Sequence, residues 1–509
     1  MQGIRPSIIK ITLALIFSAA VIVSPQQNDV SSKENILPKN TLGEIINSFI
    51  SVINSSDKDS VSIFVNKYLS KDLGPVAGKI WSGEKYLSLL QNLRQDAGLI
   101  SPVDVSKSND ENYLVVIFKT TKSEKPVGIE FKKNINDNTL RSLEVHVLGM
   151  PNKPYQWPGE KLDEKGIADA INEKLQKDFN AGSFSGNVLI ARGDKIILEK
   201  SYGYANIEKQ ILNNDKTRFH TGSLGKMITA TAIAQLVERG KLKFSDTLGT
   251  ILKDYPNSEA AKGITIHELL THTSGVADPF ELGRRKPGVD YSTPKSNLPL
   301  FADAELTMKP GSHHSYSNGN YAVLAAIVEQ VSGMTFENYI NENIFKPAGM
   351  QIGNQQEYKN LPIATRYSNS AENDPLALRP VTPVVDLEND IQFEYSGYSN
   401  GYLTADDVYR FLYSLRENKL VSKEMVDMIT TGKVSIEEGA PFKYGYGFYD
   451  ANMWGVNLRG HSGGGGKSGI GADAEMLWNN NYYVIVLGNC DLEKVRPISF
   501  SIVRFLGNQ

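Results

Sequence analysis

The N-terminal part of the chain carries apolar residues at helical spacing. Between residues 41 and 96 they recur three or four positions apart, as at Ile45, Phe49 and Ile53. Residues at this spacing lie on one face of a helix, so the pattern predicts amphipathic helices that bury that face.

Strand patterns follow the helices. Apolar and polar residues alternate in three segments separated by polar turns: 113–119, 127–132 and 143–148. Helices followed by an antiparallel sheet predict an α+β domain over residues 40–150, and this order of elements resembles the NTF2-like cone fold. We find no group of catalytic residues in it. The segment MPNKPYQWPG holds three prolines in ten residues, which predicts a linker over 151–159.

A second domain is expected over residues 160–509. Apolar strands flank Gly193-Asp194 and, near the C-terminus, an Asn479-Asn480 turn. Between them, a helix is predicted to begin near Ser223 and to end near Gly240. Its expected buried stripe consists of Ile228, Ala232, Ile233 and Leu236.

Composition and charge narrow the classes of protein. The chain has 509 residues, which suggests two or three domains, and a net charge of −3 with no basic run, which argues against a nucleic-acid partner. Its one cysteine, Cys490, cannot form an internal disulfide.

The N-terminus has the layout of a secretory signal peptide over residues 1–25. Arg5 and Lys10 precede an apolar run from Ile11 to Val23, which is too short for a comfortable membrane span. The protein is therefore expected to be exported, to the periplasm, the cell surface or the medium. Membrane contact is expected only if this segment stays uncleaved, and the oligomeric state is left open.

Ser223 and Lys226 are the first candidates for chemistry. A serine hydroxyl needs a base beside it to act as a nucleophile, and a lysine three residues further along a helix lies on the same face. The alternative is a helix-capping serine with a surface lysine. The same S-x-x-K spacing also occurs at Ser7, Ser55, Ser82 and Ser292, so the motif is weak alone.

Tyr316 and Asn318 strengthen the case. They follow a Pro310-Gly311 turn and precede an apolar helix. From that position the Tyr316 phenol can relay a proton to and from Ser223, and the Asn318 amide can hold Lys226 and a substrate carbonyl.

At this point the chain resembles the serine β-lactamase and penicillin-binding protein superfamily, in the branch that holds class C β-lactamases, D-amino-acid peptidases and related esterases. The resemblance covers residues 160–509 and rests on four motifs: GSLGK, ITIHELLTHTSGV, KPGSHHSYSN and RGHSGGG. It implies an antiparallel sheet flanked by helices, with a helical subdomain. It also implies an acyl-enzyme on Ser223.

The resemblance assigns RGHSGGG to a strand beside the nucleophile. His461, Ser462 and Gly463 take the place of the family's K-T-G or H-x-G triplet, Gly463 lets the substrate approach, and the amides of Gly464 and Ser223 form the oxyanion hole. Two other interpretations are weaker. A phosphate loop ending in G-K-S would need glycine where His461 stands, and a zinc protease needs histidines four apart, whereas His267 and His272 are five apart. We expect no metal and no cofactor.

The predicted function is an exported serine hydrolase that acts on an ester or amide, as an esterase or as a D-amino-acid-specific carboxypeptidase or aminopeptidase. Its substrate would be a small molecule or a peptide. The alternative is a β-lactamase or a penicillin-recognising sensor. A neutral His461 would hold a substrate carboxylate less well than lysine does, but Arg459, two residues away on the same strand face, could bind it.

Overall fold

The structure is a computed structural model that describes most of the chain. It describes residues 37–57, 59–69, 83–105, 111–122, 127–134, 138–147, 155–180, 184–284, 286, 289, 291, 293–351, 361–369, 384–386, 395–437, 440–465 and 468–509. The predicted signal segment, with its apolar run, lies outside the described residues. Contacts divide the chain into two compact units, one of which contains Trp157–Asn369 and Val384–Gln509.

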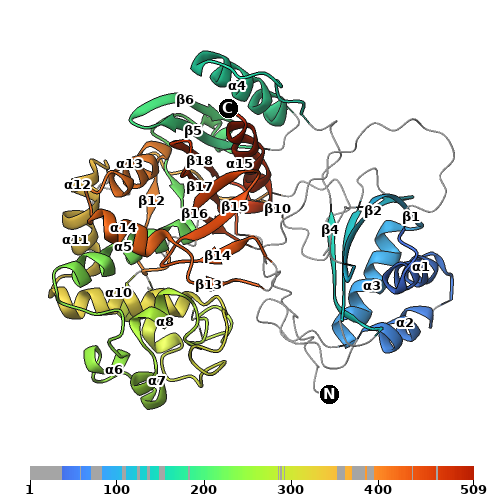
Figure 1. Cartoon of the computed structure of the whole chain (residues 1–509), viewed down its shortest axis with the longest axis horizontal. Coiled ribbons are helices and arrows are strands. Elements are labelled where there is room, and N and C mark those ends of the chain that lie inside the picture. Colours follow the sequence, from blue (N-terminus) through green and yellow to red (C-terminus); the bar gives the residue numbers. More distant parts are fainter. Residues whose placement is uncertain are drawn as a thin grey trace. The chain divides into compact units, whose positions relative to one another are not determined.

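The N-terminal unit packs three helices on a four-stranded antiparallel sheet of order β1-β2-β3-β4 (Figure 1). Its elements are α1 (Thr41–Asn54), α2 (Ser60–Tyr68), α3 (Gly83–Ala97), β1 (Ile100–Val105), β2 (Tyr113–Thr120), β3 (Val127–Lys133) and β4 (Leu140–Val147). Phe49 of α1 is fully buried and its ring lies 5.2 Å from that of Phe131 in β3. The predicted helices-then-sheet order is therefore present, while the likeness to the NTF2-like cone stays a prediction.

The larger unit is built on an eight-stranded antiparallel sheet of order β13-β14-β15-β16-β17-β18-β5-β6. These strands are β5 (Gly186–Arg192), β6 (Lys195–Tyr202), β13 (Val434–Ser435), β14 (Phe442–Tyr444), β15 (Tyr449–Met453), β16 (Val456–Gly464), β17 (Gly471–Leu477) and β18 (Tyr482–Gly488). The predicted Asn479-Asn480 turn joins β17 to β18, in which Leu477 pairs with Tyr482.

Helices cover both faces of this sheet. On one face α4 (Glu164–Asn180) and α15 (Leu492–Gly507) pack on alternate residues such as Val188 and Val486. The intervening residues, such as Leu189 and Ile485, belong to the core on the other face. Because each face of β17 and β18 has a cover, every residue of these two strands is buried.

Helices and short elements on the second face carry most of the predicted site residues. The helices there include α5 (Gly225–Glu238), α6 (Leu248–Ile251), α7 (Ser258–Gly263), α8 (Ile266–Leu270), α9 (Pro294–Asn297), α10 (Asn318–Ser332), α11 (Phe336–Ile340), α12 (Lys346–Ala348), α13 (Ala405–Arg416) and α14 (Lys423–Thr430). Short helical turns η1 (Gly222–Leu224), η2 (Leu298–Leu300) and η3 (Asn341–Phe345) and short strands β7 (Tyr204–Asn206), β8 (Ile211–Leu212), β9 (Phe219–His220), β10 (Tyr367–Asn369), β11 (Val384–Asp386) and β12 (Tyr402–Leu403) complete the unit.

Helix α5 departs from the sequence prediction. A single buried stripe was expected, but every residue from Gly225 to Leu236 is buried. The helix contacts α10, α11 and α14, so it has no exposed face until its last turn. It ends before Gly240, whose φ of 67° is left-handed, as the predicted stop requires.

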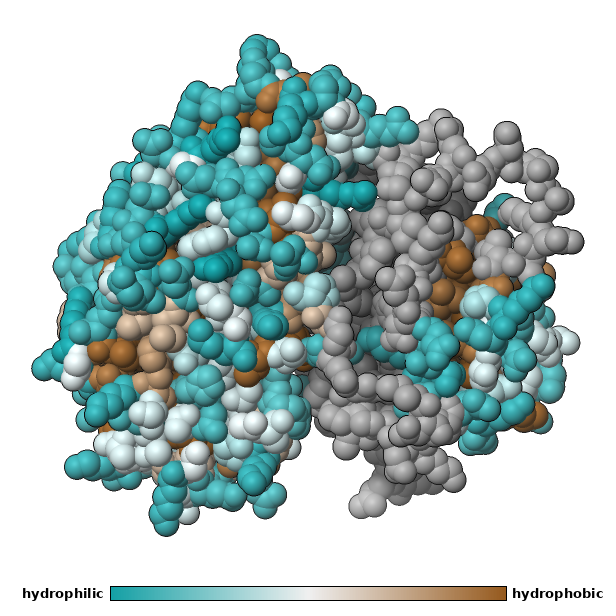
Figure 2. All heavy atoms as spheres, in the orientation of Figure 1, coloured by the Kyte–Doolittle hydropathy of each residue, from teal (hydrophilic) through white to brown (hydrophobic). Residues whose placement is uncertain are grey.

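No helix in the described part of the chain is long and apolar enough to cross a membrane. On the face drawn in Figure 2, hydrophilic side chains cover most of the larger unit, with smaller apolar patches between them.

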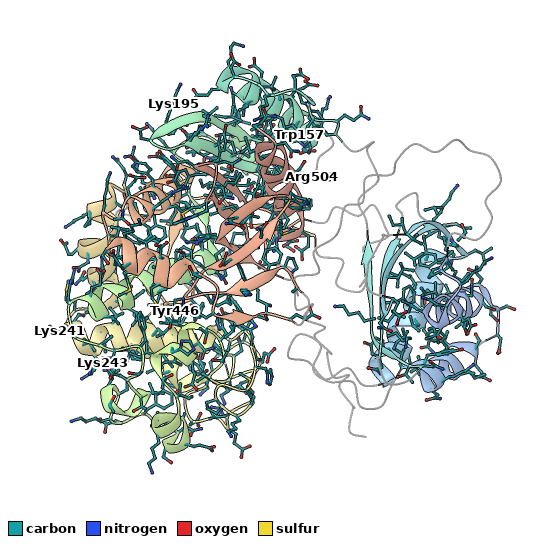
Figure 3. The ribbon with its side chains drawn as sticks, in the orientation of Figure 1. Trp157, Lys195, Lys241, Lys243, Tyr446 and Arg504 are labelled. Atoms are coloured by element: carbon teal, nitrogen blue, oxygen red, sulfur yellow. The ribbon has the colours of Figure 1, made fainter. Side chains whose placement is uncertain are left out.

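Trp157, inside the predicted linker, packs on the larger unit. Its ring stacks on Phe505 of α15 with centroids 4.2 Å apart, and its Nε1 donates to Ser501 Oγ at 3.3 Å. Figure 3 shows Trp157 close to Arg504, which belongs to α15 like Phe505. The packed chain therefore begins before residue 160.

We expect Trp157→Ala to lower the free energy of unfolding of the full chain by about 1–3 kcal/mol, because it removes an aromatic stack on a core helix. Trp157→Phe keeps a stacking ring and loses only the hydrogen bond, so it should cost about 1 kcal/mol or less. Chemical denaturation followed by circular dichroism measures both changes. Equal stability of the alanine variant and the wild type would show that this contact is dispensable.

Candidate active site

Ser223 lies in the short turn that leads into α5. Lys226, in the first turn of α5, is fully buried, and its Nζ lies 3.0 Å from Ser223 Oγ. Two glycines let the turn approach its surroundings. A Cβ on Gly225 would lie 2.6 Å from the backbone nitrogen of Asn400, and Gly222 has a left-handed φ of 52°. The two glycines of the GSLG sequence are thus required, Gly225 by close packing and Gly222 by its backbone conformation.

Tyr316 and Asn318 meet this pair from the start of α10. Ser317 caps the helix by accepting a hydrogen bond from Gly319 N at 3.1 Å, which fixes the residues on either side of it. The Tyr316 hydroxyl donates to Ser223 Oγ at 2.8 Å, and Asn318 Oδ1 accepts from Lys226 Nζ at 2.7 Å. The structure therefore brings these four predicted residues together.

The surroundings of Lys226 favour its uncharged form. Burial lowers the pKa of Lys226 well below its usual 10.5, and the carboxylate of Asp278 opposes that shift in part. The other groups around Nζ are the backbone oxygen of Tyr398, at 3.4 Å, and three tyrosine rings. A neutral amine beside the serine hydroxyl can accept its proton.

Tyr316 is suited to donate a proton. About a third of the residue (36 %) is exposed, but burial of the phenol against its neighbours still raises its pKa well above 10. The phenol therefore stays protonated at neutral pH and keeps its hydrogen bond to Ser223.

Strand β16 runs beside the nucleophile. A Cβ on Gly463 would lie 1.9 Å from the Thr221 carbonyl oxygen and 2.9 Å from the backbone nitrogen of Ser223, so only glycine allows this approach. Gly464 follows with a φ of 125°. A Cβ on Gly222 would lie 3.0 Å from the Gly464 nitrogen, so the amides of Ser223 and Gly464 belong to the same small region.

The imidazole of His461 is directed toward protein atoms, and its predicted role in the site stays a prediction. The residue is 1 % exposed, and burial lowers the pKa of its imidazole to about 3. Its Nδ1 lies 2.6 Å from the Ser462 carbonyl oxygen and its Nε2 lies 3.0 Å from the Tyr444 hydroxyl. Both ring nitrogens are thus engaged with the protein.

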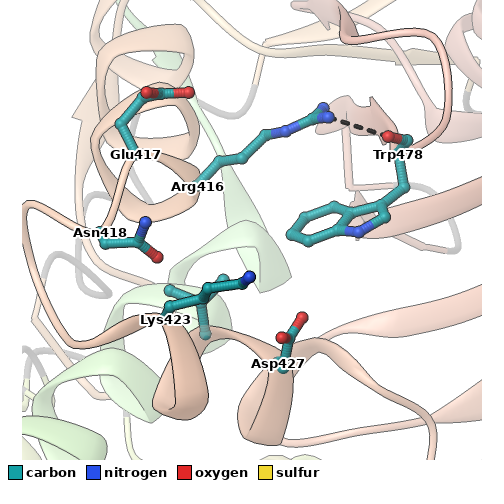
Figure 4. Close-up of a pocket in the computed structure, with 7 residues that line it drawn as sticks. Arg416, Glu417, Asn418, Lys423, Asp427 and Trp478 are labelled. Atoms are coloured by element: carbon teal, nitrogen blue, oxygen red, sulfur yellow. Dashed lines mark hydrogen bonds between the residues drawn. The ribbon is translucent and has the colours of Figure 1, made fainter.

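Arg459 lies on the expected strand face but binds other groups. Its guanidinium lies 4.0 Å from the centre of the Trp478 ring and donates to Thr430 Oγ1 at 2.9 Å and to Asp427 at 3.5 Å. Helix α14, which carries Thr430 and Asp427, contributes to the wall of a cavity of about 280 Å³, and no residue around Ser223 lines that cavity. Figure 4 shows this cavity, with Arg416 donating to the backbone oxygen of Trp478 at 2.8 Å. Arg459 therefore already has protein partners, and its role as a carboxylate anchor stays a prediction.

Asp278 is a site residue that the sequence did not indicate. Its Oδ2 accepts from both the backbone N and the Nδ2 of Asn318, each at 2.9 Å, and its Oδ1 accepts from Phe280 N at 2.8 Å. Because the amide nitrogen of Asn318 faces this carboxylate, its oxygen must face Lys226. The residue follows the THTSG motif by only a few positions, which is the one signal that could have found it.

The other histidines and the glutamate of the two sequence motifs contact protein groups. Glu268 closes a capping box with Thr265 at the start of α8, and His267 Nδ1 lies 2.7 Å from the Tyr446 hydroxyl. His314, expected on the loop surface, packs against His272 with ring centres 5.7 Å apart. Within the described residues, no group of three or more histidine, cysteine, aspartate or glutamate side chains could hold a metal ion.

The G-K-S stretch does not have the setting of a phosphate loop. β16 leads into it and the antiparallel strand β17 follows, where such a loop would open a helix. Gly466 and Lys467 themselves lie outside the described residues.

Comparison with known proteins agrees with this architecture. The β-lactamase family model matches residues 169–499, more than half of the chain. PbpX of Bacillus subtilis, named as a penicillin-binding protein, is 36 % identical over 286 residues, which are 55 % of this chain and 66 % of PbpX. The chain therefore spans just under two thirds of that relative's length.

Two further relatives cover the same unit. Teichoic acid D-alanine hydrolase of Staphylococcus aureus is 28 % identical over 322 residues, which are 62 % of this chain and 75 % of that protein. The crystal structure of a penicillin-binding protein from Bacillus halodurans matches with a TM-score of 0.53 and 27 % identity, over 65 % of this chain and 97 % of that one.

The fold and the family match define the class of protein. The chain belongs to the β-lactamase family and has a mixed helix and antiparallel-sheet fold.

We expect Asp278→Asn to shift the acidic limb of the kcat/KM profile to lower pH by about 1 unit. The base must be unprotonated, so activity falls as pH drops through the pKa of Lys226. Removing the carboxylate lowers that pKa further, whereas the asparagine oxygen still accepts from Asn318. A profile measured with a neutral ester checks this. A limb that stays in place or moves to higher pH would contradict the assignment of that limb to Lys226.

Proposed function

We propose that this protein hydrolyses esters or amides through an acyl intermediate on Ser223. One observation carries the proposal: the serine oxygen lies 3.0 Å from a buried amine and 2.8 Å from a protonated phenol. A nucleophile between a base and a proton donor is the arrangement that acyl transfer needs.

In the acylation step Ser223 Oγ attacks the substrate carbonyl carbon and passes its proton to Lys226 Nζ. The Oγ–C bond forms and the bond from that carbon to the leaving alcohol or amine breaks. The leaving group takes a proton from Tyr316 Oη, which regains one from the Lys226 ammonium. In deacylation a water molecule attacks the acyl carbon, its proton passes to the same pair, and Ser223 recovers its proton as the acid leaves.

The negative charge that develops on the carbonyl oxygen needs donors. We assign that role to the amides of Ser223 and Gly464, because β16 brings Gly463 against the backbone of Thr221 and Ser223. In this assignment Gly463 provides room for the substrate, and His461 supports the strand without contacting the substrate.

We infer that the preferred substrates carry a cation near the scissile carbonyl, as D-alanyl esters and other aminoacyl esters or amides do. Asp278 is half-buried, is hydrogen-bonded to Asn318 and acts electrostatically on Lys226, so its carboxylate favours a substrate ammonium and disfavours a carboxylate. Arg459, which could have bound a carboxylate, is bound to Thr430 and Trp478 instead. The similarity to teichoic acid D-alanine hydrolase supports the same class.

A β-lactamase or a penicillin-recognising sensor is the second candidate. It is favoured by the similarity to PbpX, named as a penicillin-binding protein. It requires a carboxylate-bearing substrate in a site whose acidic group, Asp278, opposes that charge.

We also propose that the hydrolase unit is self-contained within residues 160–509 together with Trp157, that residues 40–150 form an accessory domain, and that the protein is exported. All the residues of the proposed mechanism come from the larger unit, and the N-terminal segment from Arg5 to Val23 has the pattern of a signal peptide.

We expect the full chain to hydrolyse D-alanine methyl ester about tenfold more efficiently than methyl D-lactate, its neutral isostere, and to turn over a chromogenic cephalosporin least. The ammonium of the first substrate is attracted by Asp278, and the carboxylate of the cephalosporin is repelled. The measurement is kcat/KM for each compound near pH 7, with mass spectrometry to detect acyl-Ser223.

Two variants serve as controls. Ser223→Ala should reduce turnover of every substrate by about a thousandfold or more. Arg459→Ala should leave the order of substrates unchanged. A wild-type preference for the cephalosporin that Arg459→Ala abolishes would instead establish the β-lactamase alternative, with Arg459 as the carboxylate anchor.

A further inference from the structure

Two buried histidines are joined through one tyrosine hydroxyl beneath the proposed site. His272 follows α8 and His461 lies in β16. Tyr444 is the last residue of β14, and its hydroxyl lies between the two imidazole rings. The Tyr444 hydroxyl lies 3.2 Å from His272 Nε2 and 3.0 Å from His461 Nε2. All three residues are at most 1 % exposed, so water cannot replace these hydrogen bonds.

The neighbours of His272 determine where its proton lies. Ser317 N and Asn320 Nδ2 approach its Nδ1 at 3.2 and 3.1 Å. The backbone N–H is a donor, and Asn320 must present its amide nitrogen because its oxygen accepts from Ser274 Oγ. Nδ1 is therefore an acceptor, and a neutral His272 carries its proton on Nε2, from which it donates to Tyr444.

The contacts of His461 give the same direction for these hydrogen bonds, independently of His272. His461 Nδ1 lies 2.6 Å from the Ser462 carbonyl oxygen, which can only accept, so this nitrogen carries the proton. His461 Nε2 is then an acceptor, and Tyr444 must donate to it. The hydrogen bonds run in one direction, from His272 to Tyr444 to His461 to the Ser462 carbonyl.

The two ends of this hydrogen-bonded chain contact different parts of the proposed site: His272 contacts Tyr316, and His461 contacts the segment that contains Gly463. The His272 ring lies against the Tyr316 ring with centroids 4.2 Å apart, and it also accepts from Ser317 N, the residue after Tyr316. His461 is bonded to the carbonyl that precedes Gly463, the glycine packed on Ser223.

The backbone of His272 shows that its position is imposed by the surrounding structure. Its φ of 56° is left-handed, which non-glycine residues adopt at some energetic cost. Such a conformation persists only where contacts on several sides hold it, and here they are the bonds to Ser317, Asn320 and Tyr444.

We propose that His272, Tyr444 and His461 form a positioning chain. This chain holds the Tyr316 phenol and the Gly463–Gly464 segment at fixed positions relative to Ser223. This inference rests on the proposed acyl transfer. The three residues do not touch the reacting atoms. They act by keeping the proton donor and the oxyanion donors at fixed separations from one nucleophile.

The first test is spectroscopic and needs no substrate. Histidine 15N NMR of the full chain should show one neutral ring protonated at Nε2, for His272, and one protonated at Nδ1, for His461, both unchanged between pH 5.5 and 8. Tyr444→Phe should shift both sets of signals. If both rings carry the proton on the same kind of nitrogen, or titrate near the ordinary pKa of about 6.5, the directed chain is wrong.

The second test is kinetic. Tyr444→Phe removes one hydroxyl and keeps the ring, so kcat should fall about tenfold or more while KM changes little, because substrate still binds but the donors lose their alignment. Tyr446→Phe is the matched control: it removes the hydroxyl that lies 2.7 Å from His267 Nδ1, and kcat should stay within about twofold. Figure 3 labels Tyr446.

Acylation separates this proposal from the one on which it rests. Tyr444→Phe should still form acyl-Ser223, only more slowly, as mass spectrometry can show. Absence of acyl-Ser223 in the wild type would overturn the proposed function while leaving the NMR result as a test of the chain. Wild-type kcat in Tyr444→Phe would overturn the positioning role even if Ser223 is acylated.

Discussion

The desolvation of Lys226 is the constraint on which the rest of the site depends. An ammonium without water around it is costly, and so the buried side chain favours the neutral amine that can take a proton from Ser223. Burial on every side of α5 keeps water away. In the proposed mechanism, the Asn318 oxygen, the Tyr398 carbonyl and the nearby Asp278 carboxylate stabilise the ammonium that forms when Lys226 takes this proton.

The antiparallel sheet supplies the backbone segment that lies beside Ser223. β16 pairs with β15 through Val456–Gly460 and with β17 through Leu458–Gly464, so its pairing with β17 holds the backbone that approaches Ser223. Glycine at 463 allows an approach that any side chain would block. Helix α10 brings Tyr316 and Asn318 from the other side, and the site is therefore assembled where three separately packed elements meet around one serine.

Local spacing explains which of these residues the sequence could predict. Ser223 and Lys226 are three positions apart at the start of a helix, and Tyr316 and Asn318 lie at a turn before another helix. Short-range rules therefore make each pair a candidate, and the family resemblance brings the two pairs together. Asp278 is hydrogen-bonded to Asn318, which lies 40 residues further along the chain. A single sequence shows no pattern that would pair two residues at this separation. Alternation placed Arg459 on the right strand face, but Trp478 and α14, which engage it, come from distant segments. Strand β1 was missed as well, and it contains Pro102, a residue that is unfavourable in strands.

The most direct test of the account is the pKa of Lys226 itself. Titration of 15N-labelled lysine side chains by NMR, with the Lys226 signal assigned as the one missing from Lys226→Met, reports the charge of this group without any substrate. The account predicts a pKa well below 10.5, low enough that a substantial share of the amine is neutral at the pH of turnover. A Lys226 that stays fully charged up to about pH 10 would contradict its role as the base.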